Sequence, residues 1–533
     1  MGLRDRFRGL SVADSLAVRV AEDPQRPFVA FGDRKLTYGQ VDAQSSALAA
    51  AFHELGIEEG DRIALTLPNW PEFVVTVFAA AKLGAVIVPL NPKYTTPELQ
   101  YMLRHSETVA VVTAENWEGI DYLARYEGFL TSLPDLQYVV SVGVEDLWYD
   151  DRIYQFEDLL SSGEGRVFPH RSGIAADETF AILYTSGTMG KPKGVALSHE
   201  NLLGPASSTA DVVGLVEGDV VFGIHTLFNA FGLGAGLLGT LVAGASLVLQ
   251  EDLDPARALE IVEREGVTVL HGVPTSFVVA LREPSRRERR LGSVRTGIVA
   301  GAPVPEELVG RIGRELVPGI HIGYGLTEAG EVVALTRDDD PPAKRTGTVG
   351  RPLPEVEVRV LDVDGSTLPV ESVGEVAVRG PGVMKGYYRQ PGETSQVFTE
   401  DGFFLTGDLG MMDEEGYLHI LGRRKEMIIR GGFNVYPREV EDRLHAHPAV
   451  LDVAIVGLPD EILGEVACAC IVPVEGAIVT GSEIKDFCRE VLAEYKVPDL
   501  VRFLDGFPMT GSGKVRRVEL ARMISAEESS RRP

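Results

Sequence analysis

The sequence predicts an α/β protein with a large N-terminal domain of two parallel-sheet halves and a small β unit, followed by a small α+β C-terminal domain. Helical and strand patterns alternate through most of the first 345 of the 533 residues, as in parallel sheets covered by helices. Near residue 347 short strands separated by glycine turns take over, and after 424 helices return. We expect the N-terminal domain at 1–424, with its β unit at about 346–423, and the C-terminal domain at 425–533.

The first half shows the alternation directly. A strand at 63–67 is followed by an apolar helix at about 71–83, which ends at Gly84 before the strand AVIVPL. A further helix opens at Pro97, a residue favoured in the first helical turn, and leads into the strand VAVVTA. Consecutive strands joined through helices indicate a parallel sheet.

The second half contains an uncharged segment, 230–249, long enough to raise the question of a membrane span. Gly244 and Ala245 split it into a glycine-rich helix and the strand SLVLQ, and acidic residues flank it on both sides. We therefore expect a buried helix and strand. The remaining chain alternates strands and helices up to the strand HIGYG.

In the β unit, Asp364 and Gly365 form a hairpin signal, and EVEVRV, GEVAVRG, GFFLTGD and GYLHILGR read as short strands. In the C-terminal domain, REVEDRLHAH and EIKDFCREVLAEY read as helices. The strands VLDVAIVG and VACACIVPV alternate with them, and Cys468 and Cys470 are expected to share one face of a strand.

Composition excludes several classes of protein. A formal net charge of −27 argues against general nucleic-acid binding, because a phosphate backbone would be repelled. Three cysteines provide neither a disulfide framework nor zinc-ligand spacing, which fits a reducing cytoplasm. The basic cluster 282–290 is either a solvated helix end or a surface attracted to anionic lipid or to the phosphates of CoA. Peripheral membrane contact and the oligomeric state, a dimer included, stay open.

The stretch 184–194, YTSGTMGKPKG, lies between two predicted strands, FAIL and VALS, and is rich in groups that bind phosphate. Its glycines allow backbone amides to approach an anion, and its hydroxyls and lysines add donors and charge. It is not a P-loop of the NTPase type, because two residues separate Gly187 from Gly190 and Pro192 follows Lys191. An ordinary surface hairpin is the alternative.

Four later clusters add further candidates. Tyr324 in IGYGLTEA offers a face for a purine, and Thr327 and Glu328 offer oxygen ligands suited to magnesium. FLTGD presents Asp408, which could bind a ribose diol. GRRKEMIIRGGFN contains Arg423 and a flexible glycine pair, and FPMTGSGKVRR presents Lys514 on another turn. Each cluster alone is more often an ordinary turn.

Together and in this order, these stretches resemble the adenylate-forming superfamily of acyl-CoA synthetases, carrier-protein adenylation domains and firefly-type luciferases. YTSGTMGKPKG is similar to its phosphate loop, AGAPV and YGLTE to its adenine site, and FLTGD to its ribose site. GRRKE is similar to its hinge and PMTGSGK to its C-terminal lysine loop, and matches run from about Leu36 to Leu520. Fatty acyl-CoA synthetases are the most similar members.

The resemblance implies that a carboxylate attacks Mg·ATP to give an acyl adenylate and pyrophosphate, after which a thiol, CoA, captures the acyl group and AMP leaves. It implies that Lys514 is catalytic, bridging the carboxylate and the α-phosphate, with Thr185, Thr327 and Glu328. Thr185 and Glu328 would hold Mg²⁺. ATP would contact Thr185, Ser186, Gly187, Thr188, Gly190, Lys191, Lys193, Gly301, Ala302, Pro303, Tyr324, Gly325, Thr327, Asp408 and Arg423.

The C-terminal domain is implied to be mobile. Lys425 occupies the hinge position, about which the domain would turn so that Lys514 leaves the site. The loop of Gly431, Gly432, Phe433 and Asn434 would then replace it and line the path of CoA. One lysine cannot serve both steps, so a domain rotation fits the chemistry.

The acid pocket is implied to include His225, Phe228, Asn229, Phe231 and Gly232. This segment is apolar and has no Lys or Arg to pair a second carboxylate, which favours a medium- or long-chain fatty acid over an aryl acid. Asn229 departs from the histidine of many fatty acyl-CoA synthetases, and Met189 from the small residue usual in the phosphate loop. Three other readings stay open: loading of a separate carrier protein, a luciferase-like oxidoreductase, and a non-enzymatic nucleotide-binding membrane protein.

Overall fold

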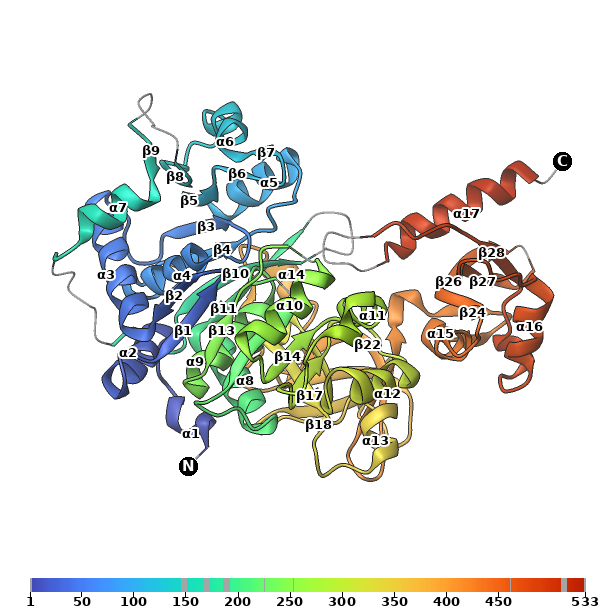
Figure 1. The fold of residues 1–533 in the computed structure, drawn as a ribbon. Helices are drawn as coiled ribbons and strands as arrows, with labels where there is room; N and C mark the ends of the chain where they lie inside the picture. Colours follow the sequence, from blue (N-terminus) through green and yellow to red (C-terminus); the bar gives the residue numbers. More distant parts are fainter. Residues whose placement is uncertain are drawn as a thin grey trace.

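The computed structural model describes residues 2–144, 151–166, 173–185, 192–224, 226–252, 254–460, 462–509 and 515–531. Two large mixed sheets with covering helices form most of the N-terminal domain, and the C-terminal domain lies to one side of it (Figure 1). This architecture confirms the predicted α/β class with a large N-terminal and a small C-terminal domain.

The first large sheet has eight strands in the order β21-β11-β10-β4-β3-β5-β8-β9. Its central strands pair in parallel, whereas β10 and β11 form an antiparallel hairpin. The strands are β3 (Arg62–Thr66), β4 (Val86–Pro89), β5 (Thr108–Ala114), β8 (Tyr138–Val142), β9 (Ile153–Gln155), β10 (Thr179–Thr185), β11 (Lys193–Ser198) and β21 (Gly386–Tyr387).

Helices connect these strands, and their ends follow the expected signals. Helix α4 begins with a proline in its first turn and ends at Gly84, whose φ of 75° is left-handed. Capping boxes begin α2, α3 and α5. The early elements are α1 (Leu3–Phe7), α2 (Val12–Glu22), α3 (Tyr38–Glu54), α4 (Pro71–Leu83), α5 (Thr96–Ser106), α6 (Tyr122–Leu130), α7 (Phe156–Gly163) and the short strands β6 (Asn116–Trp117) and β7 (Ile120–Asp121).

The second large sheet has nine strands in the order β18-β17-β16-β15-β14-β12-β13-β1-β2. The two halves exchange segments, because the N-terminal hairpin β1–β2 joins this sheet while β10 pairs with β4 in the first. The strands are β1 (Pro27–Phe31), β2 (Arg34–Thr37), β12 (Val220–Ile224), β13 (Ser246–Val248), β14 (Val269–Gly272), β15 (Thr296–Val299), β16 (Gly319–Leu326), β17 (Glu331–Leu335) and β18 (Arg351–Pro352).

The uncharged segment forms a buried helix and strand, as predicted. Its helical part begins as a π-helix, η1 (Gly232–Leu238), and continues as α9 (Gly239–Ala243) before β13. In the part of the chain that the structure describes, no helix is long and apolar enough to cross a membrane. The neighbouring helices are α8 (His199–Val212), α10 (Pro255–Glu265), α11 (Pro274–Arg282), η2 (Pro284–Glu288), α12 (Glu306–Glu315), η3 (Thr327–Ala329) and α13 (Pro342–Gly347).

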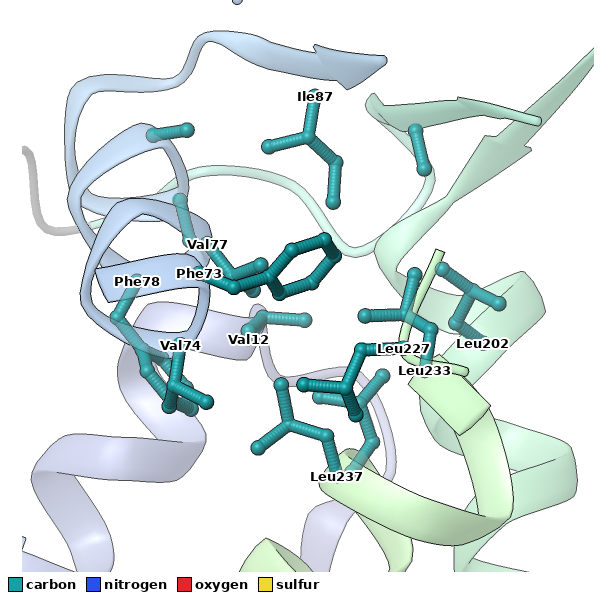
Figure 2. Packing of buried hydrophobic residues seen from close by; sticks show 14 of the residues in the cluster. Val12, Phe73, Val74, Val77, Phe78, Ile87, Leu202, Leu227, Leu233 and Leu237 are labelled. Carbon is teal, nitrogen blue, oxygen red and sulfur yellow. The ribbon is translucent and has the colours of Figure 1, made fainter. Parts of the chain in front are cut away.

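The largest core cluster joins the two halves. Figure 2 shows Leu233 and Leu237 of η1 packed beside Leu202 of α8 and opposite Phe73 of α4, and all four side chains are buried. These residues remove a large apolar surface from water, at about 1.5–3 kcal/mol for each large side chain. The core therefore holds one face of η1 in a fixed position.

The predicted β unit forms an antiparallel sheet in the order β19-β20-β22-β23. Gly365 adopts a φ of 82° in the connection between β19 and β20, at the predicted turn. Within the same range β21 pairs with β11, so it belongs to the first large sheet. The elements are β19 (Glu357–Leu361), β20 (Gly374–Arg379), α14 (Pro391–Ser395), β22 (Phe404–Met412) and β23 (Leu418–Arg423).

The C-terminal domain is a sheet with helices on it. Cys468 and Cys470 are both buried on β27 and contact one core cluster, which agrees with the expected shared strand face. Its elements are η4 (Arg424–Glu426), β24 (Ile428–Arg430), β25 (Phe433–Val435), α15 (Pro437–His445), β26 (Val450–Asp460), β27 (Gly464–Pro473), α16 (Gly481–Arg489), η5 (Glu494–Lys496), β28 (Leu500–Phe503) and α17 (Arg517–Arg531).

Candidate active site

The two strands predicted on either side of the phosphate-loop candidate are present and form a hairpin. Strands β10 and β11 pair antiparallel, and Thr185 stands opposite Lys193 at the end of the ladder. The tip itself, 186–191, lies outside the described residues, together with the expected phosphate contacts Ser186, Gly187, Thr188, Gly190 and Lys191. Thr185 and Lys193 therefore fix where the tip begins and ends.

Thr185 lies beside the glutamate that the sequence analysis pairs with it for magnesium. Its hydroxyl is 3.5 Å from Oε1 of Glu328, and the Tyr387 hydroxyl donates to the same oxygen at 3.2 Å. Glu328 is placed by η3, the short turn directly after β16. Two oxygen donors suit a Mg²⁺ ion that takes its other ligands from phosphates and water. Among the described residues, no cluster of three metal-ligating side chains offers a competing site.

Lys193 has partners that the sequence analysis missed. Its ammonium pairs with Glu393 and lies 4.5 Å from the centroid of the Tyr387 ring. Tyr387 on β21 thus contacts both Lys193 and Glu328. No local pattern marks Tyr387 or Glu393, because the chain returns from the β unit to place them there.

Asp408, Tyr324 and Arg423 come together from three strands. Asp408 Oδ2 accepts a hydrogen bond from the Tyr324 hydroxyl at 2.6 Å, and Oδ1 lies 2.6 Å from Arg423 Nε. Asp408 and Arg423 are register partners across β22 and β23. Burial, and then the nearby Asp408 carboxylate, raise the pKa of Tyr324 well above its ordinary value, so the phenol stays a donor.

The expected adenine-side residues follow the carboxyl end of β15. Because β15 and β16 are parallel with Val299 beside Ile322, the exposed loop of Gly301, Ala302 and Pro303 lies at the same sheet edge as Tyr324. Ligands in open α/β sheets bind at this edge. Gly325 and Thr327 continue this edge towards Glu328.

The acid-pocket segment leads into η1. His225 lies outside the described residues, Asn229 is exposed and bonds Thr226 Oγ1 at 2.7 Å, and Phe228 is half-buried. The Phe231 ring lies 6.1 Å from the ring of His271. Gly232 is needed for packing, because a Cβ there would overlap the carbonyl of Thr226. Asn229 therefore faces solvent, close in the chain to Phe228 and Phe231.

Glu331 is a second feature that the sequence analysis missed. It begins β17, is 4% exposed, and both of its carboxylate oxygens lack a hydrogen-bond partner among the described residues. Burial raises its pKa well above the ordinary glutamate value. A glutamate at the head of the apolar run EVVAL, just after YGLTEAG, is the signal that could have found it.

The glycine pair of the expected CoA path forms a tight hairpin. Gly431 and Gly432 have φ values of 56° and 83° between β24 and β25, which favours glycine at both positions. The exposed Phe433 ring stacks 4.9 Å from that of Tyr495, and Asn434 is exposed. The loop is therefore an exposed hairpin tip.

The proposed hinge lies at the join of the two domains. Lys425 is exposed in η4, immediately after Arg423, and Arg438 of α15 donates to the Ile420 carbonyl at 2.8 Å. Lys514 lies outside the described residues, whereas Arg517, which follows it, pairs with Glu441 and Glu426. Arg423, the expected ribose contact, and Lys425, the expected hinge, are thus two residues apart on one chain segment.

The basic cluster is largely neutralised by carboxylates. Arg286 pairs with Glu315 at 2.6 Å, and Arg289 and Arg290 both reach Glu263. These partners favour a solvated surface over an attraction to lipid or CoA phosphates.

Comparison with known proteins places the chain in a family. Residues 16–388 match the family model described as AMP-binding enzyme, and 439–514 match AMP-binding enzyme C-terminal domain. The chain is 36% identical to a feruloyl-CoA synthase of Amycolatopsis sp, over 95% of this chain and 97% of the relative. It is 32% identical to the mitochondrial medium-chain acyl-CoA ligase ACSF2 of Bos taurus, over 95% of this chain and 86% of the relative.

A solved structure agrees over the full length. The anthranilate CoA ligase AuaEII, in complex with anthranoyl-AMP, superimposes with a TM-score of 0.90 at 27% identity, covering 99% of this chain and 100% of that one. Both domains are included in that coverage. The chain therefore belongs to the AMP-binding enzyme family, and relatives that match nearly its whole length are named CoA synthases and ligases.

Proposed function

We propose that the protein is an ATP-dependent, AMP-forming acyl-CoA synthetase that activates an apolar carboxylic acid, a medium- or long-chain fatty acid by preference. The acid forms an acyl adenylate with release of pyrophosphate, and CoA then takes the acyl group with release of AMP. The observation that carries this proposal is the meeting of Thr185 and Glu328 beside the buried Tyr324–Asp408 pair and its partner Arg423, an arrangement that suits one nucleoside triphosphate with its metal.

Each group has a physical task in the proposed reaction. Asp408 accepts hydrogen bonds from the ribose diol through lone pairs left beside Tyr324 and Arg423. The hairpin from Thr185 to Lys193 would hold the β- and γ-phosphates, and Thr185 and Glu328 would hold Mg²⁺, which would supply positive charge against the phosphates. Lys514 aligns the carboxylate with the α-phosphate. Charge neutralisation and alignment are sufficient, because the acid itself is the nucleophile.

The acid is the least constrained part of the proposal. The apolar, glycine-rich segment around Phe231 and η1 supports an aliphatic chain, and the medium-chain specificity in the name of the bovine relative agrees with it. The feruloyl and anthranilate specificities in the names of two other relatives support the alternative, an aryl acid.

A panel of straight-chain and aryl acids, assayed for pyrophosphate and AMP release with and without CoA, tests the proposal. We expect acid-dependent pyrophosphate release and, with CoA, a stoichiometric thioester. Adenylate formation without transfer to CoA would favour a separate carrier protein as acceptor. Oxygen uptake or light emission would favour a luciferase-like reaction, and no acid-dependent release of pyrophosphate would refute the assignment.

A further inference from the structure

Glu331 is a buried carboxyl group that the proposed reaction does not use. Its side chain is almost fully removed from solvent, and neither oxygen has a partner within the described residues. Glutamates are rarely buried without a partner, because the loss of hydration is not repaid. A buried glutamate of this kind is either protonated or bonded to a hydrogen-bond donor that a bound ligand supplies.

The carboxyl group is directed at η1, the helix that follows the acid-pocket residues. A Cβ on Gly234 would overlap Glu331 Oε2, and the backbone amide of Ala235, which makes no hydrogen bond of normal geometry to the carboxyl group, lowers the pKa of Glu331 against the larger effect of burial. The face of η1 that carries Leu233 and Leu237 packs into the core (Figure 2). Gly234 thus leaves room for the carboxyl group beside the turn that begins at Gly232.

The backbone of Glu331 is strained. Glu331 has a φ of 118°, a value that residues with a side chain rarely adopt. The β16–β17 ladder has a bulge between Tyr324 and Gly325, and a Cβ on Gly325 would overlap the Glu331 carbonyl. Two glycines are therefore required to accommodate Glu331, which lies three residues after Glu328. Gly234 leaves room for the carboxyl group, and Gly325 leaves room for the backbone carbonyl. Strain of this kind occurs mainly at functional sites.

The surroundings of η1 contain further unused polar groups. Helix α8 packs against both η1 and β17, and its buried hydroxyls Ser207, Ser208 and Thr209 make no hydrogen bond to any described residue.

We infer that Glu331 is a specificity-determining residue of the acid pocket, and that the preferred acid carries a hydrogen-bond donor, a hydroxyl or an amino group, on an otherwise apolar skeleton. The inference rests on the proposed acyl-CoA synthetase function. The donor lies away from the carboxylate that is adenylated, because Glu331 contacts η1 while Glu328 contacts Thr185. A site built to bond a polar group discriminates strongly against the analogue that lacks it.

The test compares acids that differ only at the far end. The first series consists of straight-chain acids of six to twelve carbons (~C6–C12, spanning the usual size of a ligand pocket), each with a methyl, hydroxyl or amino end. The second series consists of 3-phenylpropanoate and its ring-hydroxyl and ring-amino forms. For at least one skeleton we expect kcat/KM to be about tenfold or more higher with the donor than without it. Equal or lower values for every donor-bearing acid would overturn the inference.

Two variants separate specificity from folding. In Glu331→Leu, the ratio of kcat/KM for the donor-bearing acid to kcat/KM for the methyl-ended acid should fall to one or below. The kcat/KM for the methyl-ended acid should be unchanged or higher. Glu331→Gln keeps the shape and one carbonyl acceptor, so it should keep part of the preference for the hydroxyl and lose most of that for the amine. If kcat/KM falls by the same factor for all acids in either variant, Glu331 has a structural role only, and the inference is refuted.

The outcome is distinguishable from failure of the proposed function. If no acid supports pyrophosphate release in the wild-type protein, the enzymatic assignment fails. If acids are activated but the ratio is the same in wild type and Glu331→Leu, only the role of Glu331 fails. Melting temperatures of both variants identify an unfolded protein, and binding of each acid followed by its thermal shift gives the same comparison without turnover.

Discussion

At the scale of single residues, Asp408 is held by partners from two other strands. Tyr324 and Arg423 each bond one of its oxygens, so the carboxylate is oriented before any ligand arrives. Orientation in advance lowers the cost of binding, because little side-chain freedom is lost. The ribose contact is therefore expected to be sensitive to the charge of Asp408 and insensitive to nearby surface charges.

Asp408→Asn should reduce kcat/KM for ATP roughly 10- to 150-fold, since a hydrogen bond to a charged group contributes about 1.5–3 kcal/mol. The exposed Asp401 of the same β unit, which pairs with Arg359 at 2.7 Å, provides the matched control. Asp401→Asn should leave kcat/KM within about twofold, as exposed ion pairs contribute little. Comparable losses in both variants would argue against a ribose role for Asp408.

At the scale of elements, η1 owes its position to its glycines. Gly234 and Gly239 both lie in this buried helical stretch, but only Gly234 adjoins a carboxyl group. A Cβ on Gly239 would make ordinary contacts, 3.6 Å from the Gly234 carbonyl and 3.9 Å from that of Ala206. The two positions therefore form a matched pair.

Gly234→Ala should destabilise the protein by about 1–3 kcal/mol, the usual cost of overpacking a buried site. Gly239→Ala should be neutral or stabilising by up to about 1 kcal/mol, because alanine is favoured over glycine inside a helix. Urea denaturation of both variants, followed by tryptophan fluorescence, measures the difference. The explanation fails if Gly239→Ala is the more harmful change.

Helix α8 begins with His199, a buried histidine that resists protonation. His199 accepts a hydrogen bond from the Val12 amide at 3.2 Å and stacks 4.7 Å from the Phe180 ring. Burial lowers the pKa of His199 to about 4, below the ordinary value of about 6.5. The unfolded chain therefore binds a proton more readily than the folded one between these two pH values.

Stability should fall as the pH drops from about 6.5 towards 4, and this residue should account for about 3 kcal/mol by pH 4. His199→Gln retains an acceptor and removes the titration, so its unfolding midpoint should depend less on pH in this window. Urea midpoints of the two proteins at pH 7, 6 and 5 (about one unit apart, within the titration range) provide the measurement. Parallel pH curves would show that His199 does not contribute.

At the scale of the whole molecule, the proposed ribose contact, the proposed hinge and the C-terminal domain are consecutive in the chain. Arg423 ends β23, η4 with Lys425 follows, and the exposed Gly431–Gly432 turn lies a few residues further on. A rotation near Lys425 would move the C-terminal domain while Asp408 and Arg423 stay in the site. This connection supports the expected two-step use of the domain.

Lys514→Ala should abolish adenylate formation yet spare thioester formation from supplied acyl adenylate and CoA, because only the first step needs that charge. Rapid-quench measurements of the two half-reactions test this separately. Equal loss of both half-reactions would contradict the role proposed for Lys514.

Local signals in the sequence were sufficient for the elements between Thr37 and Ala114 and for the two strands that carry Thr185 and Lys193. Alternating strands, glycine turns and helix caps are encoded within a few residues of one another. Glu393 and Tyr387 could not be predicted, because they reach Lys193 only through the pairing of β21 with β11. The burial of Glu331 likewise depends on Gly234, in a distant element.

The exchange of segments between the two large sheets has a consequence for synthesis. Val29 of the N-terminal hairpin pairs with Leu247, so β1 cannot pair with its sheet until the ribosome has made the chain as far as β13. At about 5–20 residues per second, the hairpin waits for on the order of ten seconds or more with its apolar face uncovered. During that interval the hairpin β1–β2 is the part of the nascent chain most in need of a chaperone.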